Sequence, residues 1–284
     1  MKIITAVVNN PDFIEIQYHT LKKYFEGEYE FIVFNDAKDF PDFTNGNDVS
    51  IKSKIENICS SLNIQCINIQ NDQHKSNTCA ASRCADSMNY ILEYQKQHPD
   101  EYLLLDSDMF LIDFFNPSKF SQYDCAVVLQ SRNNHKIHYF WNGIYYFNIH
   151  KMKNLELLNW SCCPGCDVGG MMQRWLKKQM GGKELPDTDK IRWSEETYHM
   201  NNIYFIKHLW SCSWTIKELP KNLKEKRGLI KYLIEDNRNQ NGKIFCEIYD
   251  NVFLHYRAGG NWMGEGMELH NKLTKKLKET LLKS

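Results

Sequence analysis

The sequence predicts an α/β fold in which a mostly parallel, doubly wound sheet is flanked by helices within a single domain. Short apolar or β-branched runs alternate with stretches of helical periodicity over the first 130 residues, as in chains that build such sheets. The composition, 42% hydrophobic and 25% charged, is that of an ordinary globular protein. A length of 284 residues suffices for one large domain with a sizeable core.

The first half of the chain alternates between predicted strands and helices. Buried strands are expected where apolar, aromatic or β-branched residues cluster, at residues 3–8, 29–34, 65–69, 102–105 and 124–129. Helices are expected at residues 12–25 and 49–62, where apolar residues recur every three or four positions. A third helix should begin at Thr78, whose side chain suits an N-cap, and end near Gln97, just before Pro99.

The second half is less regular. A strand is expected at residues 141–149, a helix at 168–178 and another strand at 245–255, whereas the charge-dense residues 220–243 predict no element. Residues 267–283 predict an amphipathic basic helix with leucines at four-residue spacing, namely Leu269, Leu273, Leu277 and Leu281. We expect this leucine face to pack on the domain rather than to lie on an anionic membrane.

Charge and cysteine content exclude several classes of protein. Lys and Arg number 35, as do Asp and Glu, so no basic excess indicates a nucleic-acid partner. The ten cysteines lack the dense spacing of a disulfide scaffold, and Cys162, Cys163 and Cys166 lack the second pair that a structural zinc site requires. The N-terminal apolar run is too short for a secretory signal, and no segment approaches the ~20 apolar residues of a transmembrane helix. We therefore expect a soluble, cytoplasmic protein.

The stretch LLLDSDMFLI places Asp106 and Asp108 at the carboxyl end of the fourth predicted strand, where doubly wound sheets bind their ligands. Two residues apart in an extended segment, both side chains should point the same way, with Ser107 opposite, and suit one hard divalent cation. The alternative is a strand that ends in a solvated turn. Because the chain becomes apolar again from Met109 onward, however, the carboxylates are embedded between buried segments and need a compensating partner.

This stretch resembles the Asp-x-Asp segment of nucleotide-sugar-dependent glycosyltransferases with the GT-A fold, a Rossmann-like α/β fold. A second stretch, FLHYRAGGNW, resembles the His-x-x-Gly-x-x-Lys-Pro-Trp segment of the glycogenin-like and bacterial retaining galactosyltransferase family. The resemblance implies that Asp106, Asp108 and His255 hold Mn²⁺ or Mg²⁺, and a borderline cation such as Mn²⁺ accepts an imidazole beside carboxylates. In this chain Asn261 replaces the Lys-Pro pair, so Arg257 is the expected substitute for the missing lysine.

Other segments resemble the same family in the expected order. Arg83 matches a helix arginine near the metal and the donor, although an arginine on a solvated helix face is the alternative. The stretch FWNGIYYFN implies donor or acceptor contacts from Asn142 and Gly143. Asp167 matches a residue that grips the donor sugar, and the alternative is a helix cap, for which Asp is preferred.

The remaining implied contacts lie at strand ends and in loops. The resemblance implies binding of the donor's nucleoside and diphosphate at Ala6, Val7, Val8, Asn9, Asp36, Ser107 and Gly260. Plain turn chemistry is the alternative for the strand ends. Glu195 and Glu196 are similar to the acidic pair that supplies the general base in inverting GT-A enzymes, with a solvated acidic pair as the alternative.

Together these resemblances imply a metal-dependent transfer of a sugar from a nucleotide-diphosphate sugar, UDP-linked rather than GDP-linked, to a hydroxyl of a glycan, glycoconjugate or protein. Retention of the anomeric configuration is favoured over inversion. Residues 1–130 would form the nucleotide-binding half, and residues 131–284 the acceptor-binding half with its C-terminal helix. Two alternatives are a nucleotidyltransferase that uses the paired Asp with Mg²⁺ and a noncatalytic nucleotide-sugar- or carbohydrate-binding protein of the same fold.

Overall fold

Two β-sheets organise the protein. The computed structural model describes residues 1–70, 79–132, 135–193, 196–262 and 266–283. Within them, the larger sheet has eight strands in the order β3-β2-β1-β4-β7-β6-β9-β8. These strands are Lys2–Val7 (β1), Glu30–Asn35 (β2), Gln65–Asn68 (β3), Glu101–Leu105 (β4), Cys125–Arg132 (β6), Ile137–Asn148 (β7), Tyr198–Met200 (β8) and Ile203–Phe205 (β9). Four of its seven pairings are parallel, which confirms the predicted mostly parallel sheet.

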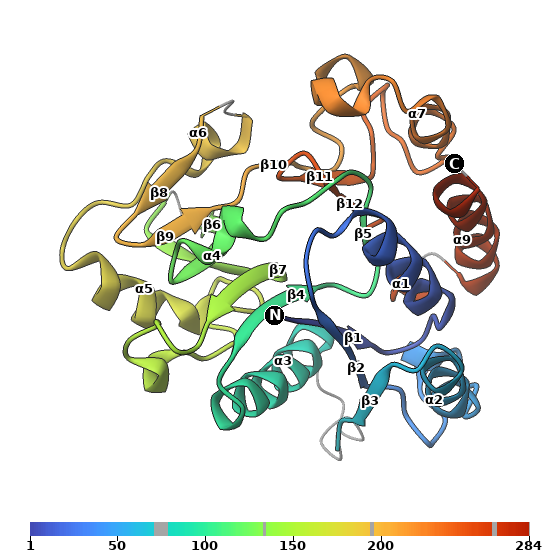
Figure 1. The fold of residues 1–284 in the computed structure, drawn as a ribbon, viewed down its shortest axis with the longest axis horizontal. Helices are drawn as coiled ribbons and strands as arrows, with labels where there is room; N and C mark the ends of the chain where they lie inside the picture. Colours follow the sequence, from blue (N-terminus) through green and yellow to red (C-terminus); the bar gives the residue numbers. More distant parts are fainter. Residues whose placement is uncertain (71–78, 133–134, 194–195, 263–265, 284) are drawn as a thin grey trace.

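Helices cover both faces of the larger sheet. On one face lie α1 (Asp12–Tyr24) and α2 (Ile51–Ser61), and on the other lie α3 (Ala80–Gln97) and α5 (Gln173–Met180) (Figure 1). Successive strand residues point to opposite faces, so Ile3 of β1 packs with α1 and α2, whereas Ile4 packs with α3. The sheet is therefore doubly wound, as predicted.

The smaller sheet is antiparallel and has the strand order β10-β11-β12-β5. Its strands are Met109–Leu111 (β5), His208–Leu209 (β10), Glu247–Tyr249 (β11) and Phe253–His255 (β12). It joins segments that are far apart in the chain, because β5 follows β4 almost directly and β12 lies near the C-terminus (Figure 1). The larger sheet thus leads straight into the smaller one at Asp106–Asp108.

Among the described residues, the other helices are α4 (Ser118–Ser121), α6 (Thr188–Trp193), α7 (Arg227–Ile234) and α9 (Met267–Leu282), with 3₁₀ turns at Phe43–Asn45, Leu155–Leu157, Gly170–Met172, Ile216–Glu218 and Lys221–Leu223. Helix α9 packs against α1 and α7 (Figure 1). It buries Leu273, Leu277 and Leu281, with Leu269 partly buried, which confirms the predicted leucine face.

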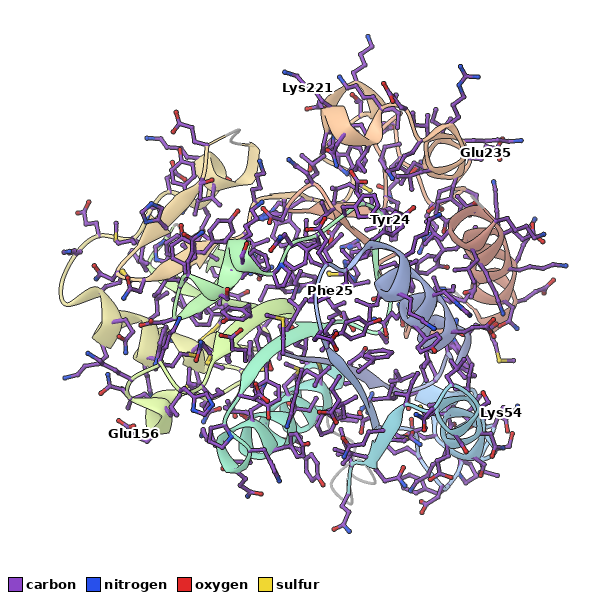
Figure 2. The ribbon with its side chains drawn as sticks, viewed as in Figure 1. Tyr24, Phe25, Lys54, Glu156, Lys221 and Glu235 are labelled. Atoms are coloured by element: carbon purple, nitrogen blue, oxygen red, sulfur yellow. A yellow bond between two sulfur atoms is a disulfide. The ribbon has the colours of Figure 1, made fainter. Side chains whose placement is uncertain are left out.

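Side chains follow the expected division between interior and surface. Tyr24 and Phe25 lie inside the molecule at the end of α1, whereas Lys54, Glu156 and Glu235 project from its rim (Figure 2). Among the described residues, no helix combines the length and the apolar character that crossing a bilayer requires.

The elements predicted for the first 130 residues are present with small shifts at their ends. The predicted N-cap Thr78 lies outside the described residues, and Cys79 stands directly before the first residue of α3. One strand was missed: Met109–Leu111 is too short to give a periodic signal, and its partners are distant in the sequence.

Two predictions for the second half are wrong in detail. The single strand expected at residues 245–255 is a hairpin of β11 and β12, whose chain reverses at Asp250 and Asn251 with φ of 49° and 67°. The helix expected at residues 168–178 begins only at Gln173, because Gly169 adopts φ 87° and a 3₁₀ turn intervenes. The polar residues 220–243, for which the sequence predicts no element, include α7, whose Leu229, Tyr232 and Leu233 are buried.

Candidate functional site

Asp106 and Asp108 lie in a tight turn between β4 and β5. The amide of Met109 donates to the carbonyl of Asp106 at 3.0 Å, and the side-chain amide of Gln17 donates to the same carbonyl at 2.8 Å. The prediction of an extended segment is therefore wrong here, because the chain must bend to pass from the larger sheet to the smaller one. The turn, rather than strand alternation, sets the direction of both carboxylates.

The third predicted ligand, His255, reaches this turn through the smaller sheet. Antiparallel pairing of β12 with β5 sets His255 opposite Met109, next to Asp108. Its Nε2 atom lies 3.0 Å from Oδ1 of Asp108 and 4.0 Å from Oδ2 of Asp106. One ligand atom from each of the three residues lies within 4.8 Å of the others.

The electrostatics of this cluster fit a divalent cation. Burial and the adjacent Asp108 carboxylate raise the pKa of Asp106 to about 7. Burial alone would lower the pKa of His255, but Asp108 and Glu247 raise it to about 10. Burial likewise opposes ionisation of Asp108, yet His255 and the amide of Gly259 lower its pKa. Two carboxylates and an imidazole so close together suit a borderline cation such as Mn²⁺, which would relieve the repulsion between the carboxylates.

Glu247 contacts His255 on the side away from the two aspartates, and the sequence analysis did not identify it as a site residue. Its side chain is almost fully buried, and its Oε2 atom lies 2.8 Å from Nδ1 of His255. The same oxygen accepts a hydrogen bond from the hydroxyl of Tyr249 at 2.8 Å. Burial opposes its ionisation, but the contacts with His255 lower the pKa of Glu247 overall. The available signal was a single glutamate inside the apolar run at residues 244–249, which by itself indicates no partner.

The cluster lies at the wall of a cavity of about 980 Å³. Most of the predicted site residues contribute to the lining: Ala6, Val8, Asp36, Arg83, Asp106, Ser107, Asp108, Asn142, Asp167, His255, Arg257 and Gly260. Further lining residues that the sequence did not indicate include Thr44, Gln130, Arg132, Trp141, Trp210 and Ser211. A volume of this size lies within the range of cavities that bind small molecules and cofactors.

Of the predicted nucleoside contacts, Asp36 is the most firmly held. One carboxylate oxygen accepts a hydrogen bond from the hydroxyl of Ser87 at 2.8 Å, and the other pairs with Lys38 at 2.9 Å. Val7 and Asn9 do not belong to the cavity lining. Val7 packs in the core, and the Asn9 amide donates to the carbonyls of Thr44 and Gly260 at 2.8 and 3.0 Å.

Gly143 has a structural role beside the cavity. Its carbonyl accepts a hydrogen bond from the amide of Asp106 at 2.7 Å, which ties β7 to the start of the turn. A Cβ atom at this position would lie 2.1 Å from the ring of Trp141, so only glycine fits. That ring in turn stacks on Tyr249 at 4.9 Å. Gly143 is not in the lining, whereas its neighbour Asn142 is.

The acidic residues of the second half lie in different places. Asp167 lines the cavity and does not cap a helix, because the residues before the 3₁₀ turn and α5 are Gly169 and Met172. The helix-cap alternative is therefore wrong. Glu196 is exposed and is not among the lining residues, and Glu195 lies outside the described residues.

Near Asp167, Cys163 and Cys166 form a disulfide, and the other eight cysteines are free.

The segment after His255 closes the site from the C-terminal side. Arg257 and Ala258 both adopt left-handed backbone conformations, with φ of 67° and 59°, which non-glycine residues rarely do. Arg238 holds this segment by donating to the carbonyls of Tyr256 and Arg257 at 3.1 and 2.9 Å. Arg238 itself pairs with the buried Asp236 at 2.8 Å. The buried Arg238–Asp236 ion pair therefore holds the strained backbone at Arg257, whose side chain lines the cavity.

No family model matches the chain, and no curated protein is significantly similar to it in sequence. Solved structures of glycosyltransferases are similar to parts of it. An active-site mutant of LgtC is 12% identical, with a TM-score of 0.38 over 55% of this chain and 61% of that chain. The galactosyltransferase LgtC in complex with donor and acceptor sugar analogs is 12% identical, with a TM-score of 0.39 over 66% of this chain and 68% of that chain. The bifunctional glycosyltransferase WbbM is 11% identical, with a TM-score of 0.34 over 52% of this chain and 31% of that chain.

This chain therefore spans less than two thirds of the first of these structures. The likeness concerns the fold, and the function proposed below rests on this chain's own residues.

Proposed function

We propose that this protein is a metal-dependent glycosyltransferase of the GT-A fold that moves a sugar from a nucleotide-diphosphate sugar to a hydroxyl acceptor. The observation that carries the proposal is the convergence of Asp106, Asp108 and His255 at the wall of the large cavity. The carboxylates and the imidazole are far apart in the sequence and are brought together by the pairing of β5 with β12. Such a cluster beside a cavity suits a substrate that carries phosphate oxygens.

The three clustered residues would hold Mn²⁺ or Mg²⁺. When bound, the cation would supply Lewis-acid stabilisation of the charge that develops on the leaving diphosphate. Arg83 and Arg257 also line the cavity, and their guanidinium groups would bind phosphate oxygens through directed hydrogen bonds. These residues therefore act on the leaving group.

The other lining residues suggest how the substrate lies. Ala6, Val8 and Asp36 come from the carboxyl ends of β1 and β2, where doubly wound sheets bind nucleosides, and we assign them to the nucleoside of a UDP-sugar. Asn142 and Asp167 come from the second half of the chain and would bind the transferred sugar. The acceptor, a hydroxyl of a glycan, glycoconjugate or protein, would enter beside Trp141 and Trp210. This assignment keeps residues 1–130 as the nucleotide half and residues 131–284 as the acceptor half.

We further propose that the transfer retains the anomeric configuration. An inverting enzyme needs a general base within reach of the acceptor hydroxyl. Of the two residues considered for that role, Glu196 is exposed and does not line the cavity, whereas Asp167 and His255, whose resemblances favour retention, both line it. NMR assignment of the product anomer tests this point, and a product of opposite configuration to the donor would contradict it.

A donor screen tests the proposed function. UDP- and GDP-sugars are incubated with the protein and Mn²⁺, and release of the nucleoside diphosphate is measured with and without EDTA. We expect release from a UDP-sugar that depends on the metal and falls by at least about 100-fold in Asp108→Ala. Asp39→Ala is the matched control, because this carboxylate is 73% exposed and does not line the cavity. Undiminished turnover in Asp108→Ala, or stabilisation of the protein by nucleoside triphosphates alone, would refute the proposal.

A further inference from the structure

Glu247 is a buried carboxylate that contacts three residues of the cavity lining, namely His255, Ser211 and Arg257. It is 3% exposed, and ionised carboxylates are rarely buried unless they are paired. Oε2 contacts Nδ1 of His255 and the hydroxyl of Tyr249, each at 2.8 Å, and Oε1 accepts a hydrogen bond from the amide of Ser211 at 3.1 Å. Its neighbours therefore fix both carboxylate oxygens.

The β11–β12 hairpin builds this arrangement. Antiparallel pairing places Glu247 directly opposite His255, so their side chains leave the same face of the smaller sheet. Tyr249, two residues along β11, points to that face as well. The contact between the glutamate and the imidazole thus follows from the register of the hairpin.

We infer that Glu247 is a positioning residue that holds His255 in the orientation required of a metal ligand and anchors Arg257 at the same time. The inference rests on the proposed metal-dependent function. With Nδ1–H donated to Glu247, the lone pair of Nε2 is directed at the side where Asp106 and Asp108 lie, 4.0 and 3.0 Å away. A carboxylate behind a ligating imidazole fixes its tautomer and makes it a stronger ligand.

The second oxygen of Glu247 extends this support to Arg257. Nε of Arg257 lies 3.5 Å from Oε1 of Glu247, and its Nη1 donates to the hydroxyl of Ser211 at 3.1 Å. The Arg257 side chain is 44% exposed, so it remains accessible to a ligand while Glu247 and Ser211 hold its guanidinium group from one side. The buried carboxylate of Glu247 therefore links His255, the proposed metal ligand, to Arg257, which is proposed to bind the diphosphate.

The variant Glu247→Gln tests the inference, because it keeps the size of the side chain and removes its charge. Binding of Mn²⁺ alone is measured by calorimetry, and the electron paramagnetic resonance spectrum of the bound ion is recorded. We expect the Kd for Mn²⁺ to rise by about 10- to 100-fold and the spectrum to change. In EDTA, the variant should also lose affinity for UDP, since Arg257 loses its anchor.

Asp250→Asn is the matched control. Asp250 is a buried carboxylate in the turn of the same hairpin, where it contacts Tyr204 and Lys119 at 2.8 and 2.7 Å, and it does not line the cavity. This variant should bind Mn²⁺ like the unmodified protein, even where it melts at a lower temperature. A folded Glu247→Gln protein with an unchanged Kd and an unchanged spectrum would overturn the inference.

Two further measurements separate the possible failures. If Glu247→Gln does not fold, Tyr249→Phe removes one hydrogen bond that holds Glu247. A raised Kd in that variant supports the inference, and an unchanged one overturns it. The proposed function fails, and the inference fails with it, in either of two cases. In the first, the unmodified protein binds no Mn²⁺. In the second, Asp108→Ala binds Mn²⁺ with the same affinity as the unmodified protein. Normal binding that is lost in Asp108→Ala but kept in Glu247→Gln refutes the inference alone.

Discussion

Gly259 shows how closely single residues are fitted around Asp106, Asp108 and His255. Its amide donates to Oδ2 of Asp108 at 2.8 Å, and the space beside its Cα is filled by other groups. A Cβ atom there would lie 2.5 Å from the ring of Phe13 and 2.9 Å from both Cβ and Oδ2 of Asp108. The close approach of this backbone to a buried carboxylate therefore requires glycine.

We predict that Gly259→Ala displaces Asp108 and weakens Mn²⁺ binding. Overpacking of this kind typically costs about 1–3 kcal/mol of folding free energy. Urea unfolding and Mn²⁺ titration measure the two effects. Gly260→Ala is the control, because its Cβ would lie 3.5 Å from the nearest atom, in Val8, and we expect nearly normal stability and metal affinity. Equal metal affinities in the two variants would contradict the prediction.

The pKa values of the cluster predict that metal binding releases protons. Without metal, His255, with its pKa raised to about 10, is protonated at neutral pH, and Asp106, with a pKa of about 7, is partly protonated. Both must lose their protons to act as ligands. We expect Mn²⁺ binding to release more protons at pH 7 than at pH 8.5, and we expect the apparent affinity to increase with pH. Calorimetry in buffers of different ionisation enthalpy measures this release, and its absence would rule out His255 as a ligand.

At the scale of residues, the sequence predicts the three proposed metal ligands but not Glu247, which holds one of them in place. Asp106, Asp108 and His255 lie in two stretches whose resemblance to known motifs could be recognised. Glu247 could not be identified because a lone glutamate in an apolar run has no characteristic spacing. The direction of the two Asp side chains was predicted from an extended segment, whereas it results from a turn that only the second sheet explains.

At the scale of elements, the β11–β12 hairpin delivers His255 and Glu247 together. Its chain reversal depends on Asp250 and Asn251, whose positive φ values place both in the left-handed region. The amide of Val252 closes this turn by donating to the carbonyl of Tyr249 at 3.1 Å, and two consecutive residues with positive φ suit the twist of a hairpin. The sequence of residues 245–255 predicts one strand because apolar residues dominate it, and the Asp-Asn pair within it was the signal for a turn.

We predict that Asn251→Val destabilises the protein, because a β-branched residue is strained at φ 67°. The expected loss is about 1–2 kcal/mol of unfolding free energy, measured by urea denaturation. Asn251→Gly is the control, since glycine adopts this conformation freely and should preserve the stability. A valine variant as stable as the glycine variant would show that the turn is not a source of stability.

At the scale of the whole molecule, alternating patterns predict most of the doubly wound sheet, because its longer strands and the helices that cover it carry periodic signals. The three-residue strands β8 and β9 of the same sheet were not predicted. The smaller sheet could not be predicted in the same way. Its strands are two or three residues long, and, apart from the β11–β12 hairpin, they pair across large separations in the chain. The division into nucleotide and acceptor halves and the cytoplasmic location stay predictions.

The pairing of β5 with β12 also bears on how the protein is made. The two carboxylates emerge from the ribosome well before the imidazole, because most of the acceptor half lies between them in the chain. In that interval a nascent chain holds only two of the three proposed ligands. The proposed set of three ligands is complete only after the β11–β12 hairpin has docked on β5, so tight capture of an ion would follow that step of folding.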